Sequence, residues 1–508
     1  MNSKSKNTKS FFDSNTNIII LIFAIICMVS SIALKLSGMS GNDFWWHLKA
    51  GQWIFENKTI PTKALFTWYG ESQSLNWFAH EWLSEVVFYL IYHVFGTFGM
   101  YEVCLYAGML IIGATVVYNR NYIYNNYLLS SIYMLYFVIV ITQFFFGRPH
   151  TINMILLFIL LYILYKYKEY DTNLIFLLPV LSVLWVNLHG GSSNLIYIMP
   201  IIFIVSSLIS FEYGKLKSNK MAPKKLLKLS VITIISSLLL LINPRGFEMI
   251  VYPYTNMADT AMLTFLSEWN APDIKVFSKL IMLFVPVILV TAMLMLTHKK
   301  IDLTDFLIYG FYTYMFFRSQ RFISLFMIAT SFFFFKYIMP FKDKKKAGIK
   351  ANANQNKITA YTSIGLFLVI LVFQFIFASN YQKNNSLIDK ILPEQFINLI
   401  KEDNPKRLYN DYTSGGPLIF NNVKVFIDGR ADIYTGSTFK NYQTMKYVRN
   451  YNPEELNDED YMETLLKKYD FDAFLVENKT PIYHYLCQSP DKYKLIESDG
   501  TYSYFTVK

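Results

Sequence analysis

The chain has 508 residues, of which 53% are hydrophobic, 18% aromatic and only 16% charged. Soluble domains average roughly 25% charged residues, so the composition excludes an ordinary soluble protein and is typical of a polytopic membrane protein with a soluble part. The net charge of +11 would suit a nucleic-acid-binding protein, but the lysines are concentrated in a few loops, which favours topology signals. Three scattered cysteines are too few for a disulfide framework or a zinc ribbon.

Apolar runs predict eleven membrane spans, on the rule that one span needs about 20 residues. The first run is longer than the apolar core of a typical signal peptide and no small-residue cleavage pattern follows it, so we expect it to be retained. The predicted spans are about 17–37, 100–118, 127–146, 151–167, 171–187, 193–211, 229–243, 277–297, 302–317, 321–340 and 359–379.

Lysine-rich segments predict the orientation of these spans. They are the N-terminus and residues 215–228, 299–300 and 342–357. With eleven spans and a cytoplasmic N-terminus, every one of these segments is cytoplasmic, as the positive-inside rule requires. Counting 85–96 as a further span would break this agreement, so we predict an amphipathic helix there, lying in the plane of the outer interface. The sequence thus predicts a multi-pass protein of the cell membrane.

The segment 38–99 is a long polar loop directly after the first predicted span, and it carries six tryptophans. Tryptophan gathers where apolar bodies and polar tips meet, so we expect this loop at the membrane–water boundary. Acids and histidines are not needed for a membrane anchor, and their presence here is the main indication of function. These titratable residues are Asp43, His47, His80, Glu81 and Glu85.

Asp43 is the acid that lies nearest to the first predicted span. A partly desolvated carboxylate at this depth would have a raised pKa and could serve as a general base or a metal ligand. It could equally cap a helix that begins near Phe44.

His80 and Glu81 begin the predicted in-plane helix, where the helix dipole alone would favour Glu81. A zinc-protease motif is excluded, because position 84 is Ser where HExxH requires His. Acids and histidines from separate loops could still hold a divalent ion together, although their spacing is not diagnostic of one. These residues are Asp43, His47, His80, Glu81, His150 and His189.

The same topology places the polar segments 146–150, 185–191, 243–273 and 318–321 outside. Arginine at the outer end of a span needs an acid or a headgroup, and its fork of donors suits a phosphate, with snorkelling to lipid headgroups as the alternative. The candidate substrate-binding residues of these segments are Arg148, His150, Asn187, His189, Arg245, Glu268, Arg318 and Arg321. NLHGG and NPRG break helices with Gly and Pro, as cavity-lining backbone does.

From about Ser386 onward the composition is that of a small globular α/β domain, which the eleventh span would deliver outside. Period-2 patterns predict its strands, and an Asp-Gly turn predicts a hairpin. We expect strands at 407–410, 424–429 and 472–478, a helix at 453–469 and a hairpin at 493–507. Loops 410–418 and 426–434 would follow strands, where ligands bind, but Asp428, Arg430 and Asp432 could simply form an internal ion pair.

This order of elements resembles the GT-C superfamily of integral membrane glycosyltransferases, with a multi-span module at 1–380 and an extracytoplasmic α/β domain at 386–508. Several strings are similar to a bacterial group of GT-C-like membrane proteins. They are DFWWHLKAGQWI, IPTKALFTW, WFAHEWLSEVVFYL, RPH, NLHGG, NPRG and VFIDGRADIY. Many GT-C enzymes carry two acids in the first outer loop, whereas this chain has Asp43 and, where a second acid would sit, His47.

The resemblance implies transfer of a sugar, with inversion, from a polyprenyl-phosphate donor to a glycan, lipid or protein acceptor at the outer face. Asp43 would take the acceptor's proton, and Glu81, supported by His80 or His47, would orient the acceptor or hold a divalent ion. The arginines would neutralise the leaving lipid phosphate. The alternatives are a non-catalytic scaffold or lipid-glycan-binding protein of cell-envelope assembly, and a polymerase or ligase of lipid-linked glycans.

Overall fold

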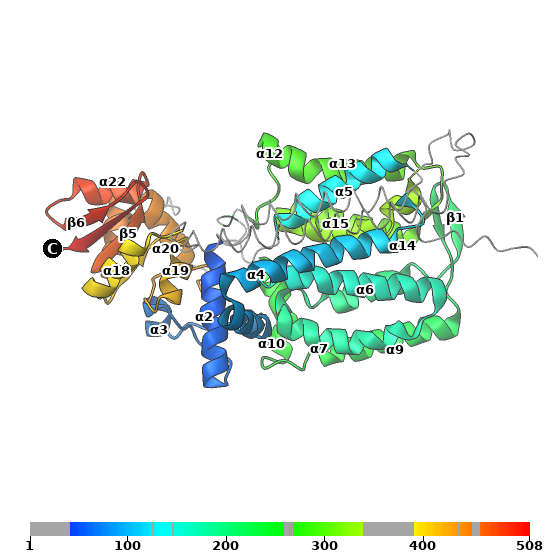
Figure 1. The fold of residues 1–508 in the computed structure, drawn as a ribbon, viewed down its shortest axis with the longest axis horizontal. Coiled ribbons are helices and arrows are strands. Elements are labelled where there is room, and N and C mark those ends of the chain that lie inside the picture. The colour runs from blue at the N-terminus through cyan, green and yellow to red at the C-terminus, as the bar shows by residue number, and fades with distance from the viewer. Residues whose placement is uncertain are drawn as a thin grey trace, which may run out of the picture.

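A computed structural model describes residues 41–123, 126–144, 147–258, 264, 266, 268–338, 391–434, 437–449 and 458–508. The first predicted span, the lysine-rich segment 342–357 and the eleventh predicted span lie outside the described residues. The described chain forms a bundle of apolar helices with an α/β unit at one end (Figure 1).

The predicted spans between residues 100 and 340 coincide with helices of this bundle. These are α4 (Trp82–Tyr118), α5 (Tyr127–Thr142), α6 (His150–Tyr170), α7 (Leu178–Leu188), α8 (Leu195–Val205), α9 (Pro223–Leu239), α12 (Phe277–Lys279) with α13 (Val285–Leu296), α14 (Leu303–Arg318), and α15 (Ile323–Ser331) with α16 (Phe334–Tyr337). Among the described residues, three stretches are long and apolar enough to cross a membrane alone: Trp82–Tyr118, His150–Tyr170 and Phe277–Leu296. The total number of spans stays a prediction.

Helix α4 is two helices that meet at a kink. Gly96, at the kink, has φ 64° and ψ −162°, a conformation that residues with a Cβ rarely adopt. The kink separates the segment 85–96 from the apolar segment 100–118, as the sequence pattern requires. That 85–96 lies in the plane of the membrane stays a prediction.

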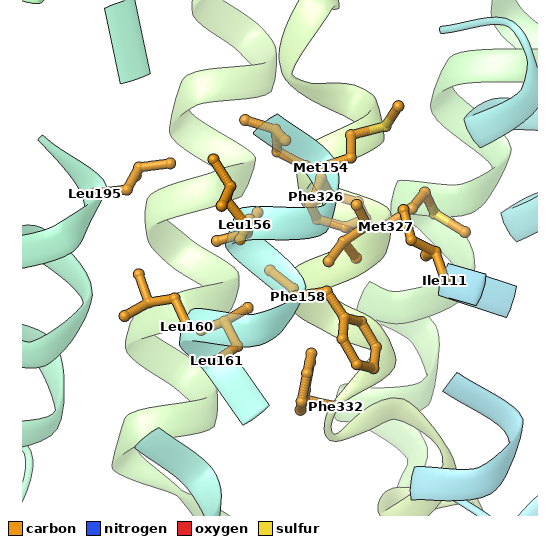
Figure 2. Packing of buried hydrophobic residues seen from close by; sticks show 14 of the residues in the cluster. Ile111, Met154, Leu156, Phe158, Leu160, Leu161, Leu195, Phe326, Met327 and Phe332 are labelled. Carbon is orange, nitrogen blue, oxygen red and sulfur yellow. The ribbon is translucent and has the colours of Figure 1, made fainter. Parts of the chain in front are cut away.

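Helix α6 lies inside the bundle and packs against α15. Met154, Leu160 and Leu161 of α6 and Phe326 and Met327 of α15 are fully buried in one cluster (Figure 2). Inside a membrane, such contacts stabilise by close packing rather than by excluding water. The bundle is therefore a firm support for the loops at its two ends.

At the end of the bundle away from the α/β unit lies a small sheet of β1 (Phe211–Tyr213), β2 (Leu216–Ser218) and β3 (Ile301–Asp302) (Figure 1). The lysine-rich segments 215–228 and 299–300 both begin at this sheet. Their position at one end, with the polar loops at the other, agrees with the predicted topology. Which side of the membrane this end faces stays a prediction.

The α/β unit contains a four-stranded sheet in the order β4-β5-β7-β6. β4 (Leu408–Asn410) runs parallel to β5 (Ala473–Glu477), and β7 (Tyr502–Val507) runs antiparallel to β5 and to β6 (Tyr493–Ser498). Its helices are α18 (Glu394–Asp403), α19 (Gly415–Phe420), α20 (Ser437–Tyr447), α21 (Asp458–Tyr469) and α22 (Pro481–Gln488). The strands predicted at 407–410 and 472–478 and the hairpin at 493–507 are confirmed.

The strand predicted at 424–429 is wrong. Val425 donates its N–H to Phe66 O at 3.1 Å, and Phe426 donates to the side-chain oxygen of Asn410 at 2.8 Å. These partners satisfy the buried backbone without a strand ladder. The segment is apolar because it is buried, not because it is a strand of the sheet. Its main-chain partner comes from the first outer loop, far away in the sequence.

The first outer loop shares its hydrophobic core with the α/β unit. Helix α2 (Asn42–Asn57) runs across the end of the bundle, between it and the α/β unit (Figure 1). Trp46 and Trp77 belong to the same buried cluster as the sheet, and Trp68 of α3 (Trp68–Ser72) stacks on Phe426 at 5.7 Å. That the loop lies at the membrane surface stays a prediction, but Trp46 and Trp77 are buried in the contact between two parts of the protein.

Candidate active site

Two adjoining cavities lie where the bundle, the first outer loop and the α/β unit meet. The polar cavity, of about 80 Å³, is lined by Asp43, Glu81, Arg148 and Glu268, and by Asp432 from the α/β unit. The apolar cavity, of about 600 Å³, lies between α6, α8, α10 (Phe247–Ala258) and α14. The two cavities share five lining residues: His80, His150, Asn256, Trp269 and Arg321.

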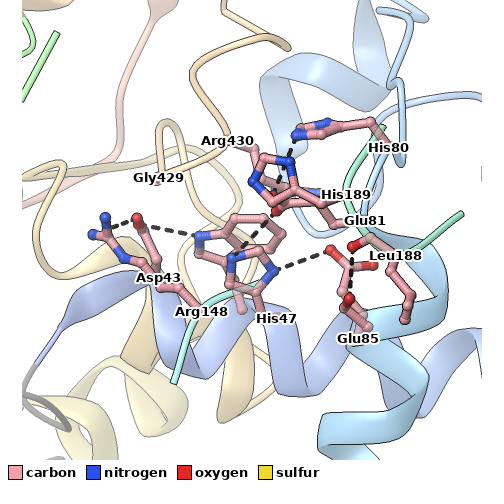
Figure 3. Close-up of polar contacts among 12 residues, drawn as sticks. Asp43, His47, His80, Glu81, Glu85, Arg148, Leu188, His189, Gly429 and Arg430 are labelled. Atoms are coloured by element: carbon pink, nitrogen blue, oxygen red, sulfur yellow. Dashed lines mark hydrogen bonds and ion pairs between the residues drawn. The ribbon is translucent and has the colours of Figure 1, made fainter. Parts of the chain in front are cut away.

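Asp43 lies in the first turn of α2, and its carboxylate faces the polar cavity (Figure 3). Its Oδ2 pairs with Arg148 Nη2 at 2.5 Å, and its Oδ1 accepts a hydrogen bond from Trp46 Nε1 at 3.2 Å. The helix is capped by Gly41 with no side-chain cap bond, so the capping alternative for Asp43 is wrong. Burial raises the pKa of Asp43, and the charge of Arg148 acts in the opposite direction.

Arg148 links Asp43 to a second acid. Its Nη1 donates to Glu268 Oε2 at 3.1 Å, and the other oxygen of Glu268 lies 3.6 Å from Arg321 Nη1. The guanidinium of Arg321 stacks on Trp269 at 4.9 Å. Acids and arginines thus alternate across the polar cavity, which offsets the cost of burying each charge.

Glu81 is surrounded by three histidines (Figure 3). Its oxygens lie 3.1 Å from His189 Nε2, 3.6 Å from His80 Nε2 and 3.8 Å from His47 Nε2. The other ring nitrogen of His47, Nδ1, lies 3.1 Å from Glu85 Oε1. The predicted support of Glu81 by His80 and His47 is therefore present in the geometry.

These contacts divide the histidines into charged and neutral ones. Burial alone would lower the pKa of His80, but Glu81 outweighs it and raises that pKa to about 9. Burial lowers the pKa of His189 to about 4. Burial alone would raise the pKa of Glu81, yet the neighbouring histidines, His80 first, hold it well below its ordinary range. At neutral pH the site therefore holds a His80–Glu81 ion pair beside a neutral His189.

The site does not fit a divalent ion. The part of the chain that the structure describes contains no group of three or more His, Cys, Asp or Glu side chains placed to hold a metal. Asp43 is engaged by Arg148, and the histidines face Glu81 rather than a common centre. Of the residues expected to share an ion, Asp43 pairs with Arg148, Glu81 with His80, and His150 faces Ser324 instead.

Two of the predicted substrate-binding residues line neither cavity. Arg245 donates to Thr62 O at 3.1 Å and to Trp77 O at 2.6 Å, so it fixes the first outer loop. Asn187 accepts from Trp82 Nε1 at 3.0 Å and donates to the carbonyl of Ile242 at 2.9 Å. The four candidate arginines therefore do not share one cavity: Arg148 lines the polar cavity, Arg318 the apolar cavity, Arg321 both and Arg245 neither.

Four of the remaining candidates line the apolar cavity. Arg318 and Arg321 line it near the turn that connects α14 and α15, and Arg321 also borders the polar cavity. His150 and His189 are buried there, and His150 Nε2 lies 3.2 Å from Ser324 Oγ. Of the eight predicted substrate-binding residues, the two cavities bring together six: Arg148, His150, His189, Glu268, Arg318 and Arg321.

Sequence reasoning missed the contribution of the α/β unit to the polar cavity. Tyr412, Gly429 and Asp432 line it. The expected internal ion pair does form, since Arg430 Nη2 binds Asp428 Oδ2 at 2.7 Å, but Asp432 is not part of it. The sequence did carry one indication of this contribution: three charged residues, Asp428, Arg430 and Asp432, lie in a loop that follows an apolar run.

No protein-family model and no curated protein sequence matches the chain. Solved structures do match it. The oligosaccharyltransferase of Archaeoglobus fulgidus in the apo form aligns over 92% of this chain and 70% of its own, with 11% identity and a TM-score of 0.51. The same protein tethered to an acceptor peptide with the NVT sequon gives 12% identity and a TM-score of 0.52, over 98% and 75% of the two chains.

A third structure of that protein, in complex with an inhibitory peptide and a dolichol-phosphate, gives 12% identity and a TM-score of 0.51 over 97% and 74% of the two chains. The fold is GT-C-like. ArnT from Cupriavidus metallidurans bound to undecaprenyl phosphate aligns over 97% and 98% at 11% identity, with a TM-score of 0.44, which is too low for a fold argument. The resemblance drawn from the motifs is thus confirmed at the level of the fold.

Proposed function

We propose that this protein is a membrane glycosyltransferase that moves a sugar from a polyprenyl-phosphate donor to an acceptor in the polar cavity. The observation that carries the proposal is the pair of adjoining cavities. A large apolar cavity lined by Arg318 and Arg321 lies beside a small polar one lined by Asp43, Glu81 and also Arg321. The apolar chain of such a donor would lie in the apolar cavity, its phosphate at the arginines and its reacting sugar in the polar cavity. The neighbour solved with a dolichol-phosphate shares the fold and supports this substrate class.

Arg318 and Arg321 would bind the phosphate of the donor. As the bond between the anomeric carbon and the phosphate oxygen breaks, its electron pair leaves with the phosphate, and the guanidinium groups neutralise the growing charge. Arg321 borders both cavities, so it lies where the phosphate of a donor that reaches from one cavity into the other would be.

Asp43 would act as the general base. The acceptor attacks the anomeric carbon from the face opposite the leaving phosphate, which inverts that carbon, and its proton passes to the Asp43 carboxylate. Burial raises the pKa of Asp43, which makes it a stronger base than an exposed aspartate. Arg148 also pairs with Glu268, so it keeps a partner when Asp43 turns to the acceptor.

Glu81 would orient the acceptor. It is held as an anion by the cation of His80, so it accepts hydrogen bonds without competing for the proton. His47 and His80 are positioning residues, because they touch Glu81 rather than the reacting atoms. We further propose that the reaction takes place at the outer face of the cell membrane, with the N-terminus in the cytoplasm.

Binding of undecaprenyl phosphate to the purified full-length protein tests the donor site. We expect Arg321→Ala to weaken binding by about 1.5–3 kcal/mol, the scale of a hydrogen bond to a charged group. Arg321→Lys should restore only part of it, because lysine lacks the bidentate fork. Arg120, exposed at the opposite end of α4, provides the control Arg120→Ala, which should leave affinity unchanged. Equal affinity of wild type and Arg321→Ala would contradict the assignment.

A further inference from the structure

One segment of the α/β unit, residues 428–432, enters the polar cavity and is held there rigidly. Arg430 is 2% exposed, and its Nε and Nη2 bind Asp428 at 2.8 Å and 2.7 Å. Its guanidinium faces the rings of Trp77 at 4.6 Å and Phe66 at 5.5 Å. Both rings belong to the first outer loop, so cation–π contacts fix this segment against that loop.

Gly429 brings the segment directly against Asp43 (Figure 3). A Cβ at this position would lie 1.7 Å from Asp43 Oδ1, so only glycine allows the approach. The turn continues with Ile433 N–H donating to Arg430 O at 3.0 Å. The position of Asp432, between Arg430 and Ile433, is therefore set by the anchored backbone on both sides.

Asp432 is the carboxylate of the polar cavity that lacks an ion pair within the described residues. The other three acids are paired: Asp43 with Arg148 at 2.5 Å, Glu268 with Arg148 at 3.1 Å, and Glu81 with His80 at 3.6 Å. Asp432 Oδ2 is buried and accepts no hydrogen bond from any residue that the structure describes. An acceptor atom left in this state is costly, so it marks a place for a donor group.

The surroundings of Asp432 place it near the junction of the two cavities. Its charge interacts with that of His80, and Tyr252 lies close to it. His80 borders both cavities, and its ring lies 4.7 Å from that of Tyr252. A sugar that extends from a phosphate at Arg321 into the polar cavity would enter the space that Asp432 and Asp43 both line. The rings of Tyr252 and Trp269 offer it apolar faces.

We propose that Asp432 recognises the transferred sugar, its Oδ2 accepting a hydrogen bond from a hydroxyl or ammonium group of that sugar. The proposal rests on the proposed function and names its donor class: neutral or amino sugars are accepted, and uronic acids are rejected. A uronate would set its carboxylate against the carboxylate of Asp432 in a small cavity, which is unfavourable. The α/β unit is then part of the donor site.

Affinities of the purified full-length protein for three probes test this. The probes are undecaprenyl phosphate, undecaprenyl phosphoglucosamine and undecaprenyl phosphogalacturonate. We expect wild type to bind the glucosamine probe more tightly than the lipid phosphate alone, and the galacturonate probe more weakly. Asp432→Asn should lower the affinity for the glucosamine probe about tenfold, because a neutral hydrogen bond replaces a charged one. The same variant should bind the galacturonate probe more tightly than wild type does. Its affinity for undecaprenyl phosphate should not change.

The matched control is Asp491→Asn, at an exposed position of the same unit, which should behave as wild type. Asp432→Ser is a second neutral variant and should relax the discrimination in the same way if Asp432→Asn folds poorly. An unchanged preference between glucosamine and galacturonate in both variants would overturn the proposal while leaving the phosphate site intact. A wild-type protein that does not bind undecaprenyl phosphate would overturn the proposed function as well.

Discussion

Asp43 shows how much of a site residue can be predicted from sequence. Its place after an apolar run and before tryptophans indicated a buried carboxylate, and it is only 9% exposed. Its partner could not be predicted in the same way. Arg148 was expected at a phosphate, but it binds Asp43 and Glu268, because the folded chain places these acids nearer. Local sequence gives the type of a residue, whereas its partner depends on tertiary contacts.

The His80–Glu81 ion pair predicts a dependence of stability on pH. The pKa of His80 is raised from 6.5 to about 9, so its contribution is complete below about pH 6.5 and is lost as the pH rises through 9. The pKa of Glu81 is lowered, so the stability that Glu81 contributes is complete above the ordinary pKa of a glutamate and is lost as the pH falls below it. At about 1.4 kcal/mol per pKa unit, the rise from 6.5 to about 9 corresponds to a loss of at most about 3.5 kcal/mol above pH 9.

Thermal unfolding in detergent between pH 6 and pH 10 measures this effect. We expect the melting temperature to fall across that range and the fall to be smaller in His80→Gln, which cannot carry the charge. His484 lies in the α/β unit, away from both cavities, and His484→Gln should retain the wild-type slope. Parallel pH profiles for wild type and His80→Gln would contradict the ion pair.

At the scale of elements, helices were predicted well because an apolar run of about 20 residues is a strong local signal. β4, β5 and the β6–β7 hairpin were also found, since each carries its own period-2 pattern or turn. The strand predicted at 424–429 does not form, because the main-chain partner of this segment, Phe66, lies in the first outer loop. Element prediction failed where the pairing was distant in sequence.

The kink in α4 leads to a prediction at this scale. Gly96→Ala should lower stability by about 1–3 kcal/mol, because φ 64° with ψ −162° is accessible almost only to glycine. Gly310 lies within α14 with no atom near its missing Cβ, so Gly310→Ala is a control that should be neutral or slightly stabilising. Denaturation of both variants in one detergent compares them. A Gly96→Ala protein as stable as wild type would mean that α4 runs straight through residue 96.

For the whole molecule, the sequence separated a membrane module from an α/β domain but could not assign the first outer loop. That loop was grouped with the membrane module, yet Trp46 and Trp77 pack in the core of the α/β unit. Contacts between such distant segments leave no trace in local periodicity. For the same reason the sequence did not predict that Gly429 and Asp432 line the polar cavity, because they reach it only through the core that the two parts share.

The proposed topology predicts which cysteines an impermeant thiol reagent can reach on intact cells. Cys487 is exposed in the α/β unit and should be labelled in a variant that retains only this cysteine. A single cysteine in place of Lys220, an exposed residue of the segment 215–228, should be labelled only after the membrane is opened. Labelling of the position-220 cysteine but not of Cys487 on intact cells would reverse the orientation.

The most direct measurement of the central claim is turnover of a sugar-linked undecaprenyl phosphate by wild type and by Asp43→Asn in parallel. Asparagine keeps the shape of aspartate and removes its basicity, so turnover should fall roughly 10²–10⁴-fold, the usual worth of a positioned base. Undecaprenyl phosphate binding should be unchanged, and Asp491→Asn should turn over donor as wild type does. If Asp43→Asn consumed donor at the wild-type rate, Asp43 would not be the base, and if wild type bound the lipid but consumed no donor, the protein would be a lipid-glycan-binding scaffold.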